Sequence, residues 1–343
     1  MSTQLEPSNL GEFTWKVSEL SILYPPRWKH RNKKAIAAIV GNDTETVGNI
    51  TASRWALSST RGIPSTIKAC VNVKLERGFF SYNQPSPDDP TKHWHMNFAD
   101  PYLFGYGEGS LLAQDELQIV EHPILASLAR AIEHGKHGVS GLKRQTQRPT
   151  QKLCATPVLV QGAPRRCNLN TTNLYGDNFS FASKETVEAA VTTITPPTLS
   201  NILALSAIPP QHGAYTSEQI EELYHTAYVG FRAVVLTSTH VTLHTGHWGC
   251  GTFGGNKGLV AAIQILAAGA AGIEQLVYWY GHTTLDRTAV EHGLEVASLL
   301  EGKNVEEAIG LLESAGYQWG DANENHVPYE PPHNDLLQRS DEF

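Results

Sequence analysis

The sequence predicts an α/β protein whose central sheet is covered by helices on both faces. Short segments rich in β-branched and aromatic residues alternate along the chain with longer segments of helical periodicity. The strand expected at 157–161 (PVLVQ) is short and apolar, as strands buried on both faces are. The 343 residues include 41% hydrophobic and 17% charged residues, which excludes a disordered chain and leaves ample material for a core.

The individual elements follow from these local patterns. Thr216 and Gln219 have the spacing of a capping box, which marks the start of a helix. Strands are expected at 66–75, 93–99, 157–161, 240–244 and 276–280. Helices are expected at 114–135 with an interruption at Pro123, from Thr216 to about Gly230, and at 256–271, 285–300 and 305–315.

Three regions are predicted along the chain. Residues 1–60 are expected to form an N-terminal helical accessory segment, in which the basic run 27–34 is a solvated face. Residues 61–300 carry the predicted sheet, and residues 301–343 are expected to form a helical turn and an acidic tail. Ten acidic and two basic residues in that tail account for the whole net charge of −8, so residues 1–300 are balanced.

Further features concern partners and compartment. Residues 134–176 contain seven basic and no acidic side chains, which fits either a solvated loop or a rim that attracts an anionic ligand. The four cysteines form no CxxC pair, the first residues lack a signal-peptide pattern, and the longest apolar run, 259–273, is too short to span a membrane. We therefore expect a soluble cytoplasmic protein that has no membrane partner; the nucleus is the alternative location if the source is eukaryotic.

Two loops carry candidate chemistry. The glycine-rich loop 246–255 lies between an expected strand and an expected helix, which suits a phosphate or pyrophosphate; a merely tight turn is the other interpretation. Its spacing is neither that of a P-loop nor that of the dinucleotide fingerprint. A second loop, from residue 97, leads to Asp115 and Glu116, which either complement a helix dipole or shuttle a proton to a leaving oxygen.

Several sequence blocks belong to one pattern. They are TGHWGCGTFGG at 245–255, QILAA at 264–268, VYWY at 277–280, LYHTAYVGF at 223–231, GS at 109–110 and QDE at 114–116. Together they resemble the catalytic domain of the poly(ADP-ribose) glycohydrolase family, in the macrodomain superfamily, of which the chain would be a divergent member. The resemblance covers about residues 66–282 in blocks. It implies a macrodomain-like three-layer α/β/α sandwich with a mixed central sheet at 61–300.

The resemblance also implies residue roles. Glu116 would be the catalytic acid and base, and Asp115 would contact ribose hydroxyls. The loop 249–253 would wrap the pyrophosphate, Tyr280 would stack on adenine, and Tyr175 would pack near the scissile ribose. The remaining substrate-binding residues would be Asp100, Gly105, Gly107, Gly109, Gln114, His247, Gly249, Cys250, Gly251, Thr252 and Phe253.

Departures from the family pattern surround the same ligand. The sequence Phe-Gly-Tyr at 104–106 stands where the family has three glycines, and Asp100 and His247 stand where it has asparagines. These changes suggest an altered substrate, or binding without turnover.

The sequence thus predicts an ADP-ribosyl glycohydrolase that hydrolyses O-glycosidic linkages of poly- or mono-ADP-ribose. The alternatives are a non-catalytic ADP-ribose-binding module and a structural or partner-binding protein that has drifted from the family. The expected partner is ADP-ribose or an ADP-ribosylated macromolecule, without sequence-specific binding to nucleic acid and without a cofactor. Fifteen histidines include the close pair His93 and His95, but no HExxH motif or Cys/His ligand set accompanies them, so no metal is expected.

Overall fold

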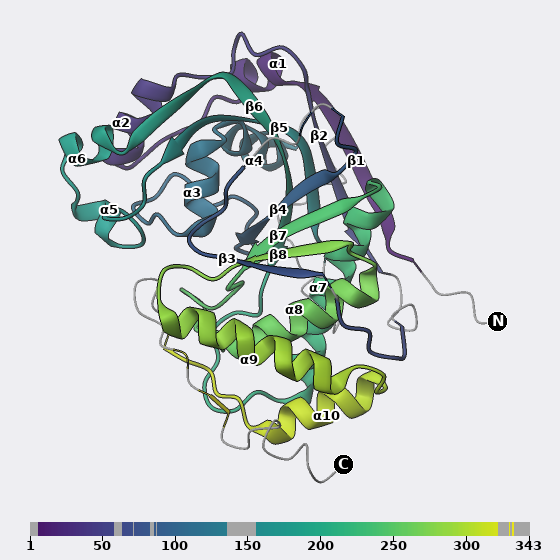
Figure 1. The fold of residues 1–343 in the computed structure, drawn as a ribbon. Helices are drawn as coiled ribbons and strands as arrows, with labels where there is room; N and C mark the ends of the chain where they lie inside the picture. Colours follow the sequence, from purple (N-terminus) through teal and green to yellow (C-terminus); the bar gives the residue numbers. More distant parts are fainter. Residues whose placement is uncertain are drawn as a thin grey trace.

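A mixed sheet of eight strands forms the centre of the molecule (Figure 1). The computed structural model describes residues 6–57, 64–70, 72–82, 86, 88–135, 156–321, 329 and 331–332. In spatial order the strands are β1 (Ser8–Lys16), β2 (Asn49–Ala56), β5 (Val158–Leu169), β6 (Val191–Ser206), β4 (Lys92–Ala99), β7 (Val241–Gly246), β8 (Gln275–Trp279) and β3 (Val73–Glu76). The pairs from β1 to β6 are antiparallel, and the pairs from β6 to β3 are parallel.

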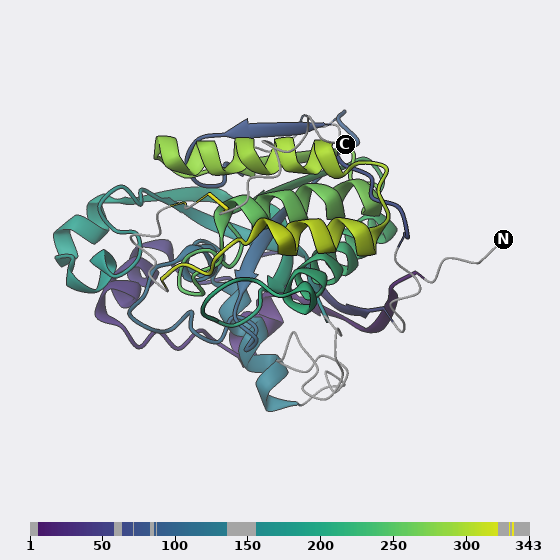
Figure 2. The ribbon, with the colours of Figure 1, turned by 90° about the horizontal axis from the view of Figure 1, so that it is seen from below.

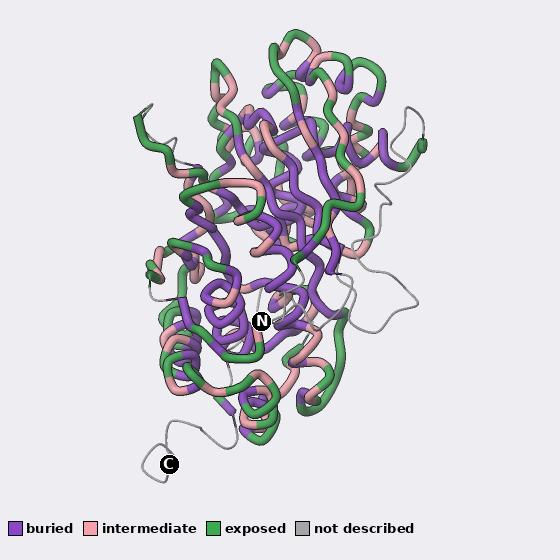
Figure 3. The backbone as a smooth tube through the Cα atoms, turned by 90° about the vertical axis from the view of Figure 1, so that its right-hand side faces the viewer, coloured by how far each residue is buried: buried purple, intermediate pink, exposed green. Residues whose placement is uncertain are grey.

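Helices cover both faces of this sheet, as the sequence predicts. In β6, Leu203 and Leu205 pack into a core with the helices of one face, whereas Ile202 and Ala204 pack into a second core on the other. The first face carries α7 (Ser217–Thr237), α8 (Lys257–Ala271), α9 (Thr284–Leu300) and α10 (Val305–Ala315), which Figure 2 shows grouped together. The other carries α1 (Val17–Leu23), α2 (Arg31–Val40), α3 (Gln114–Glu121), α4 (Ile124–His134), α5 (Asn178–Phe181) and α6 (Lys184–Ala189). Buried segments run through the middle of the molecule (Figure 3).

Most elements predicted from periodicity are confirmed. The strands at 93–99, 240–244 and 276–280, the helices at 256–271, 285–300 and 305–315, and the helix break at Pro123 lie within two residues of their expected positions. The capping box is formed, since the side chains of Thr216 and Gln219 each accept from the other's backbone N–H. Its helix and the strand from 157 are longer than predicted. The strand predicted at 66–75 is wrong over 66–70, because β3 begins only at Val73.

The prediction of a helical N-terminal segment is wrong in part. Residues 1–60 contribute α1 and α2, but also β1 and β2, and β2 extends the sheet by pairing with β5. The basic run at 27–34 is likewise not wholly solvated, because Lys33 is buried. Residues 158–161 of β5, which pair with β2, lie some hundred residues further along the chain, so no local sequence pattern indicates this pairing.

The sequence also missed β6, the longest strand. Pro196 and Pro197 argue against a strand, because proline cannot donate to the hydrogen-bond ladder. In the structure, the pairing of β6 with β5 passes from Thr193 directly to Thr198, across a shift in register, so the prolines fall where no ladder bond is needed.

Some predictions concern residues outside the described part of the chain. Five of the ten acidic residues of the tail lie there, as do Cys154 and five of the seven bases at 134–176. The two described bases form ion pairs, Arg165 with Glu121 and Arg166 with Asp43, so neither supports an anion-attracting rim. None of the described helices combines the length and the apolar character needed to cross a membrane.

Candidate active site

A cavity of about 1230 Å³ opens at the carboxyl ends of the parallel strands. Segments that follow β3, β4, β6, β7 and β8 all line it, because parallel strands direct their carboxyl ends to one edge of the sheet. This edge is where α/β proteins commonly bind ligands. Residues 168–172, at the end of β5, also line the cavity. The size exceeds the usual range of roughly 300–1000 Å³ for small-molecule sites, so the cavity can hold a dinucleotide-sized ligand.

The glycine-rich loop forms one wall. Gly249 has φ of +71°, and a Cβ atom there would lie 2.4 Å from the Cβ of Ala207, so only glycine fits this position. Trp248 is fully buried and donates its indole N–H to the Leu205 carbonyl oxygen at 2.9 Å, which fixes the loop to the end of β6. The loop then leads into α8, whose N-cap Asn256 accepts from the N–H groups of the first helical turn.

The carboxyl pair stands on another wall, at the start of α3. Gln114 fixes this helix to β4: its amide donates to the Met96 carbonyl oxygen at 2.9 Å and accepts from the Phe98 N–H at 2.8 Å. Asp115 and Glu116 therefore enter the cavity from a rigid helix start, although both are at least 94% buried. A carboxyl in such a place can hold or transfer a proton without competition from bulk water.

The two carboxyls have different hydrogen-bond partners. Asn97 donates to Oδ1 of Asp115 at 2.9 Å, and the Ala113 N–H donates to Oε2 of Glu116 at 3.0 Å. Burial raises the pKa of Asp115 to about 6, against the opposing effects of the Asn97 hydrogen bond and the charge of Lys33. Asp115 thus changes its protonation state close to neutral pH.

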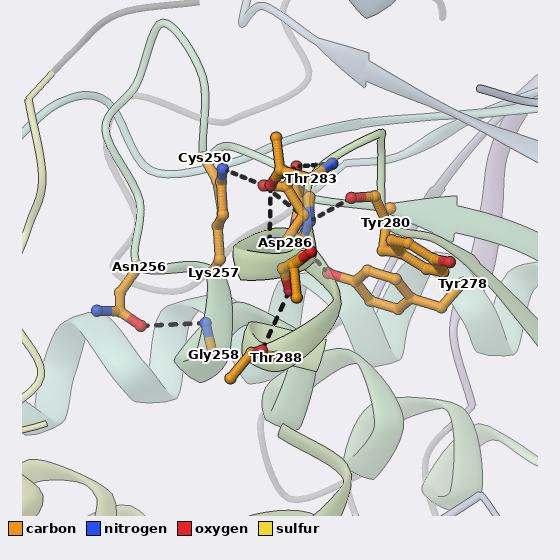
Figure 4. Close-up of polar contacts among 12 residues, drawn as sticks. Cys250, Asn256, Lys257, Gly258, Tyr278, Tyr280, Thr283, Asp286 and Thr288 are labelled. Carbon is orange, nitrogen blue, oxygen red and sulfur yellow. Dashed lines mark hydrogen bonds and ion pairs between the residues drawn. The ribbon is translucent and has the colours of Figure 1, made fainter. Parts of the chain in front are cut away.

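A polar cluster in the cavity wall connects the glycine-rich loop and the start of α8 with the start of α9 (Figure 4). Nζ of Lys257, the first residue of α8, lies 2.6 Å from Oδ1 of Asp286 in α9. Thr283 donates its N–H and its hydroxyl to the other oxygen of Asp286, at 3.2 and 2.6 Å. His247 donates through Nε2 to the Tyr280 carbonyl oxygen at 3.3 Å, and burial lowers its pKa to about 4, so it is neutral. The cluster joins the loops after β7 and β8.

Aromatic side chains from three loops meet over the cavity. The rings of Phe79 and Tyr175 are stacked with centroids 4.6 Å apart, and His282 meets Phe79 edge-on at 5.4 Å. All three line the cavity. Tyr175 therefore lies in the site but is already in contact with a ring from another loop.

Stacked histidines lie beside this site. The ring of His95 lies between those of Tyr82 and His244, with centroids 4.2 and 4.3 Å away, and Nδ1 of His93 lies 2.9 Å from Nε2 of His244. Burial lowers the pKa of His244 to about 3 and that of His95 well below its usual range, so both rings are neutral. Within the described ranges, no three His, Cys, Asp or Glu side chains gather in a group that could hold a metal ion.

The structure brings most of the predicted site residues to one cavity. Those that line it are Asp100, Gly109, Gln114, Asp115, Glu116, Tyr175, His247, Gly249, Cys250, Gly251, Thr252 and Phe253. Gly105, Gly107 and Tyr280 do not line it. Gly107 faces the side chain of Ile119 instead, which a Cβ atom at Gly107 would approach to 2.8 Å.

Tyr280 is displaced from the site by the alternation of β8. Its ring packs against a core of Ala261, Tyr278 and Val290, while the neighbouring Trp279 lines the cavity. Successive side chains of a strand point to opposite faces, so a difference of one residue decides which aromatic ring meets the ligand. The expected contact of Tyr280 with adenine therefore has no support from its position.

Sequence reasoning missed several residues at or near the cavity. Lys257 and Asp286 lie in its wall, and Phe79 and Trp279 offer rings to it. A local pattern was available for Asp286, because Thr283 and Asp286 have the spacing of a capping box. Lys33, whose charge acts on Asp115 and Glu116, had no such pattern.

Part of the chain that forms this site matches the model of a known protein family. Residues 155–287 match the model of a family described as poly(ADP-ribose) glycohydrolase with a macrodomain fold. Over these residues the chain is similar to that family, and the match covers less than half of its length. The matched residues include the glycine-rich loop and Asp286, whereas the carboxyl pair lies outside the match.

Solved structures of poly(ADP-ribose) glycohydrolases are also similar to the chain. One is the enzyme from Thermomonospora curvata, at 14% identity and a TM-score of 0.45, over 82% of this chain and 85% of that one. Another is the enzyme from Deinococcus radiodurans in complex with ADP-ribose, at 14% identity and a TM-score of 0.41, over 84% of this chain and 95% of that one.

Proposed function

We propose that the chain hydrolyses O-glycosidic ADP-ribose linkages, in poly- or mono-ADP-ribose, with Glu116 as general acid and base. One observation carries this proposal: a single cavity holds both the buried carboxyl pair of α3 and the glycine-rich loop before α8. The family match over the second of these elements supports ADP-ribose as the ligand. A cytoplasmic location belongs to the same proposal.

The glycine-rich loop is the proposed binding site of the diphosphate. Closely spaced glycines allow the backbone at 249–253 to approach a ligand, and backbone N–H groups together with the N-terminus of α8 favour negative charge. The Lys257 charge is already balanced by Asp286, so the backbone supplies most of the attraction. Asp115 is proposed to accept hydrogen bonds from ribose hydroxyls, and Gln114, Asp100 and His247 to line the same ligand.

The proposed reaction breaks the bond between the anomeric carbon of ribose and the departing oxygen. Glu116 gives its proton to that oxygen as an oxocarbenium-like state forms, and then takes a proton from the water that attacks the same carbon. Glycosidases generally divide this work between two carboxyls. Here the neighbouring Asp115 is proposed to hold the ribose, and the buried helix start keeps both groups in place.

Replacing the acid tests the proposal. Glu116→Gln is expected to lower the rate of ADP-ribose release from an ADP-ribosylated protein by at least about a hundredfold, the usual contribution of general acid–base catalysis. Product is measured by chromatography, and binding of ADP-ribose by calorimetry. Glu185→Gln, on the exposed surface of α6, is the matched control and should leave the rate unchanged. Unchanged hydrolysis in Glu116→Gln contradicts the assignment.

A non-catalytic ADP-ribose-binding module is the second candidate. Tyr106, in the loop where the family has glycines, lines the cavity and adds bulk beside the proposed ligand. The same two measurements on the unmodified protein separate the candidates. Binding of ADP-ribose without any product supports the module, and absence of binding contradicts both.

A further inference from the structure

A lysine of the N-terminal segment is buried near the carboxyl pair. Lys33 is 1% exposed, and its Nζ has no hydrogen-bond partner within the described part of the chain. Burying an ammonium group without hydrogen bonds costs several kcal/mol unless an opposite charge compensates. Its surroundings should therefore contain negative charge.

The backbone around α2 fixes where this lysine points. The N–H groups of Lys29 and His30 both donate to the Glu108 carbonyl oxygen, each at 3.2 Å, in the loop that leads to α3. In the first turn of α2, the side-chain amide of Asn32 donates to the carbonyl oxygen of Phe179, at 2.6 Å. The start of α2 is thus attached on one side to the α3 loop and on the other to α5.

The packing of α2 directs Lys33 toward α3. Ile36, three residues after Lys33 and on the same helix face, shares an apolar core with Leu117 and Val120 of α3. The face of α2 that packs against α3 through Ile36 therefore also carries Lys33, one helical turn earlier. This places Lys33 near the start of α3, where Asp115 and Glu116 lie.

The charges around Lys33 agree with this placement. Burial lowers the pKa of Lys33 to about 8, while the negative charges of Glu116, Asp115 and Glu108, in that order, raise it. Lys33 in turn favours the ionised form of Asp115, and its charge disfavours protonation of His30. At neutral pH the side chain is therefore mostly an ammonium ion held between acidic groups.

We propose that Lys33 is a positioning residue of the active site, which balances one carboxylate of the Asp115–Glu116 pair so that the other can hold a proton. A buried cluster of two carboxyls and one ammonium is neutral when a single proton is shared by the carboxyls. In this singly protonated state, one ionised carboxyl can accept hydrogen bonds from the ribose, and the protonated carboxyl can give its proton to the departing oxygen. This inference rests on the proposed glycohydrolase function for its effect on the rate.

The charge balance is tested in the free protein. Carbon-13 NMR of the side-chain carboxyls reports the titration of Asp115, whose pKa is about 6 in the structure. In Lys33→Met we expect this titration to move up by about one pH unit, because an opposite charge nearby is lost. Lys33→Arg keeps the charge and should move it much less, and Lys34→Met, on the exposed face next in sequence, should not move it. If the titration is the same in Lys33→Met as in the unmodified protein, the proposal is overturned.

The effect on the reaction is tested by a pH profile. The acidic limb of kcat/KM should move up with the titration in Lys33→Met and return in Lys33→Arg. A uniform loss of rate at every pH, with the limb unmoved, would show a merely structural role and overturn the positioning role. Lys33→Gln provides a second neutral variant should Lys33→Met fail to fold. If the unmodified protein does not hydrolyse ADP-ribose linkages, the proposed function fails, while the NMR titration still decides the charge balance.

Discussion

At Asp115, burial destabilises the ionised carboxyl that the proposed function requires. Its carboxyl is buried, and only the Asn97 amide and the charge of Lys33 oppose the rise of its pKa. A carboxyl that ionises only near pH 6 can serve a reaction at neutral pH, but the folded protein must accept a buried charge above that pH. Active sites often accept such a cost in stability.

This conflict predicts a stabilising substitution. The pKa of Asp115 is raised in the folded state, so its contribution to stability is present below about pH 4 and is lost as pH rises through about 6. Asp115→Asn should therefore increase the free energy of unfolding by about 2 kcal/mol at pH 8 and change it little near pH 4. Urea unfolding at both pH values measures this. Asp88→Asn, at an exposed site, should have no such dependence, and equal stability of Asp115→Asn and the unmodified protein at pH 8 would contradict the prediction.

At the scale of elements, the geometry of the site depends on side-chain contacts that fix its loops and helix starts to neighbouring strands and helices. Trp248 holds the glycine-rich loop to β6, Gln114 holds α3 to β4, and Asp286 holds α9 to α8. The first and the third contact join elements that are not consecutive in the sequence, whereas α3 is the element that directly follows β4. Small changes in these contacts should therefore act on the geometry of the whole cavity.

The glycine-rich loop predicts a specific sensitivity. Gly249→Ala places a Cβ atom 2.4 Å from Ala207 and also strains a positive φ, whereas Gly213→Ala, at φ of +76°, meets nothing within 4 Å. Both variants should lose about 1 kcal/mol through the backbone conformation. Only Gly249→Ala should in addition weaken ADP-ribose binding, by at least about tenfold, because the loop must shift. Calorimetry with ADP-ribose compares the two, and equal affinities would contradict this account of the loop.

The ion pair beside the loop predicts coupling between two side chains. Asp286→Ala removes the carboxylate that lies 2.6 Å from Nζ of Lys257, whose side chain is only 13% exposed, and should cost about 3 kcal/mol of stability. Adding Lys257→Met should recover much of this loss, since the double variant removes both largely desolvated charges. Urea unfolding of both single variants and the double variant measures the coupling, and simple additivity of the two losses would argue against it.

The sequence was most informative where chemistry is local. The glycine-rich loop and the adjacent carboxyls can be recognised from a few consecutive residues. The helices from 256 onward can be recognised from their local periodicity. Tyr280 shows the limit of such reasoning, because the side of β8 that faces the cavity depends on the register of the sheet. Lys33 shows another limit, because a basic run gives no sign of which member packs against a helix eighty residues away.

At the scale of the whole molecule, neutral buried histidines lower the free energy of unfolding on acidification. Burial lowers the pKa of His122 and of His244 to about 3, and that of His95 well below its usual value. Because these pKa values are depressed, the stability they contribute is present above about pH 6.5 and is lost as pH falls below it. Below about pH 6.5 the histidines of the unfolded chain take up protons that the same buried histidines in the folded protein do not accept.

His95→Phe should reduce this acid sensitivity. The new ring can still stack between Tyr82 and His244, while one group that titrates on unfolding is removed. The loss of unfolding free energy between pH 7.5 and pH 5 should shrink by about 2 kcal/mol. The exposed His212, replaced by Asn, provides the comparison, and an unchanged loss in His95→Phe would contradict the prediction.

The strand order has a consequence for dividing the chain. The part before residue 136 supplies β1, β2, β3 and β4, and the part after 155 supplies β5 to β8. In the sheet they interleave, since β5 and β6 lie between β2 and β4, and β7 and β8 lie between β4 and β3. Neither half, nor the family-matched region by itself, can complete its hydrogen-bond ladder. Two fragments produced separately should therefore assemble only with each other. A cut between 136 and 155 would then suit a split reporter, in which the cavity forms only when the two fragments associate.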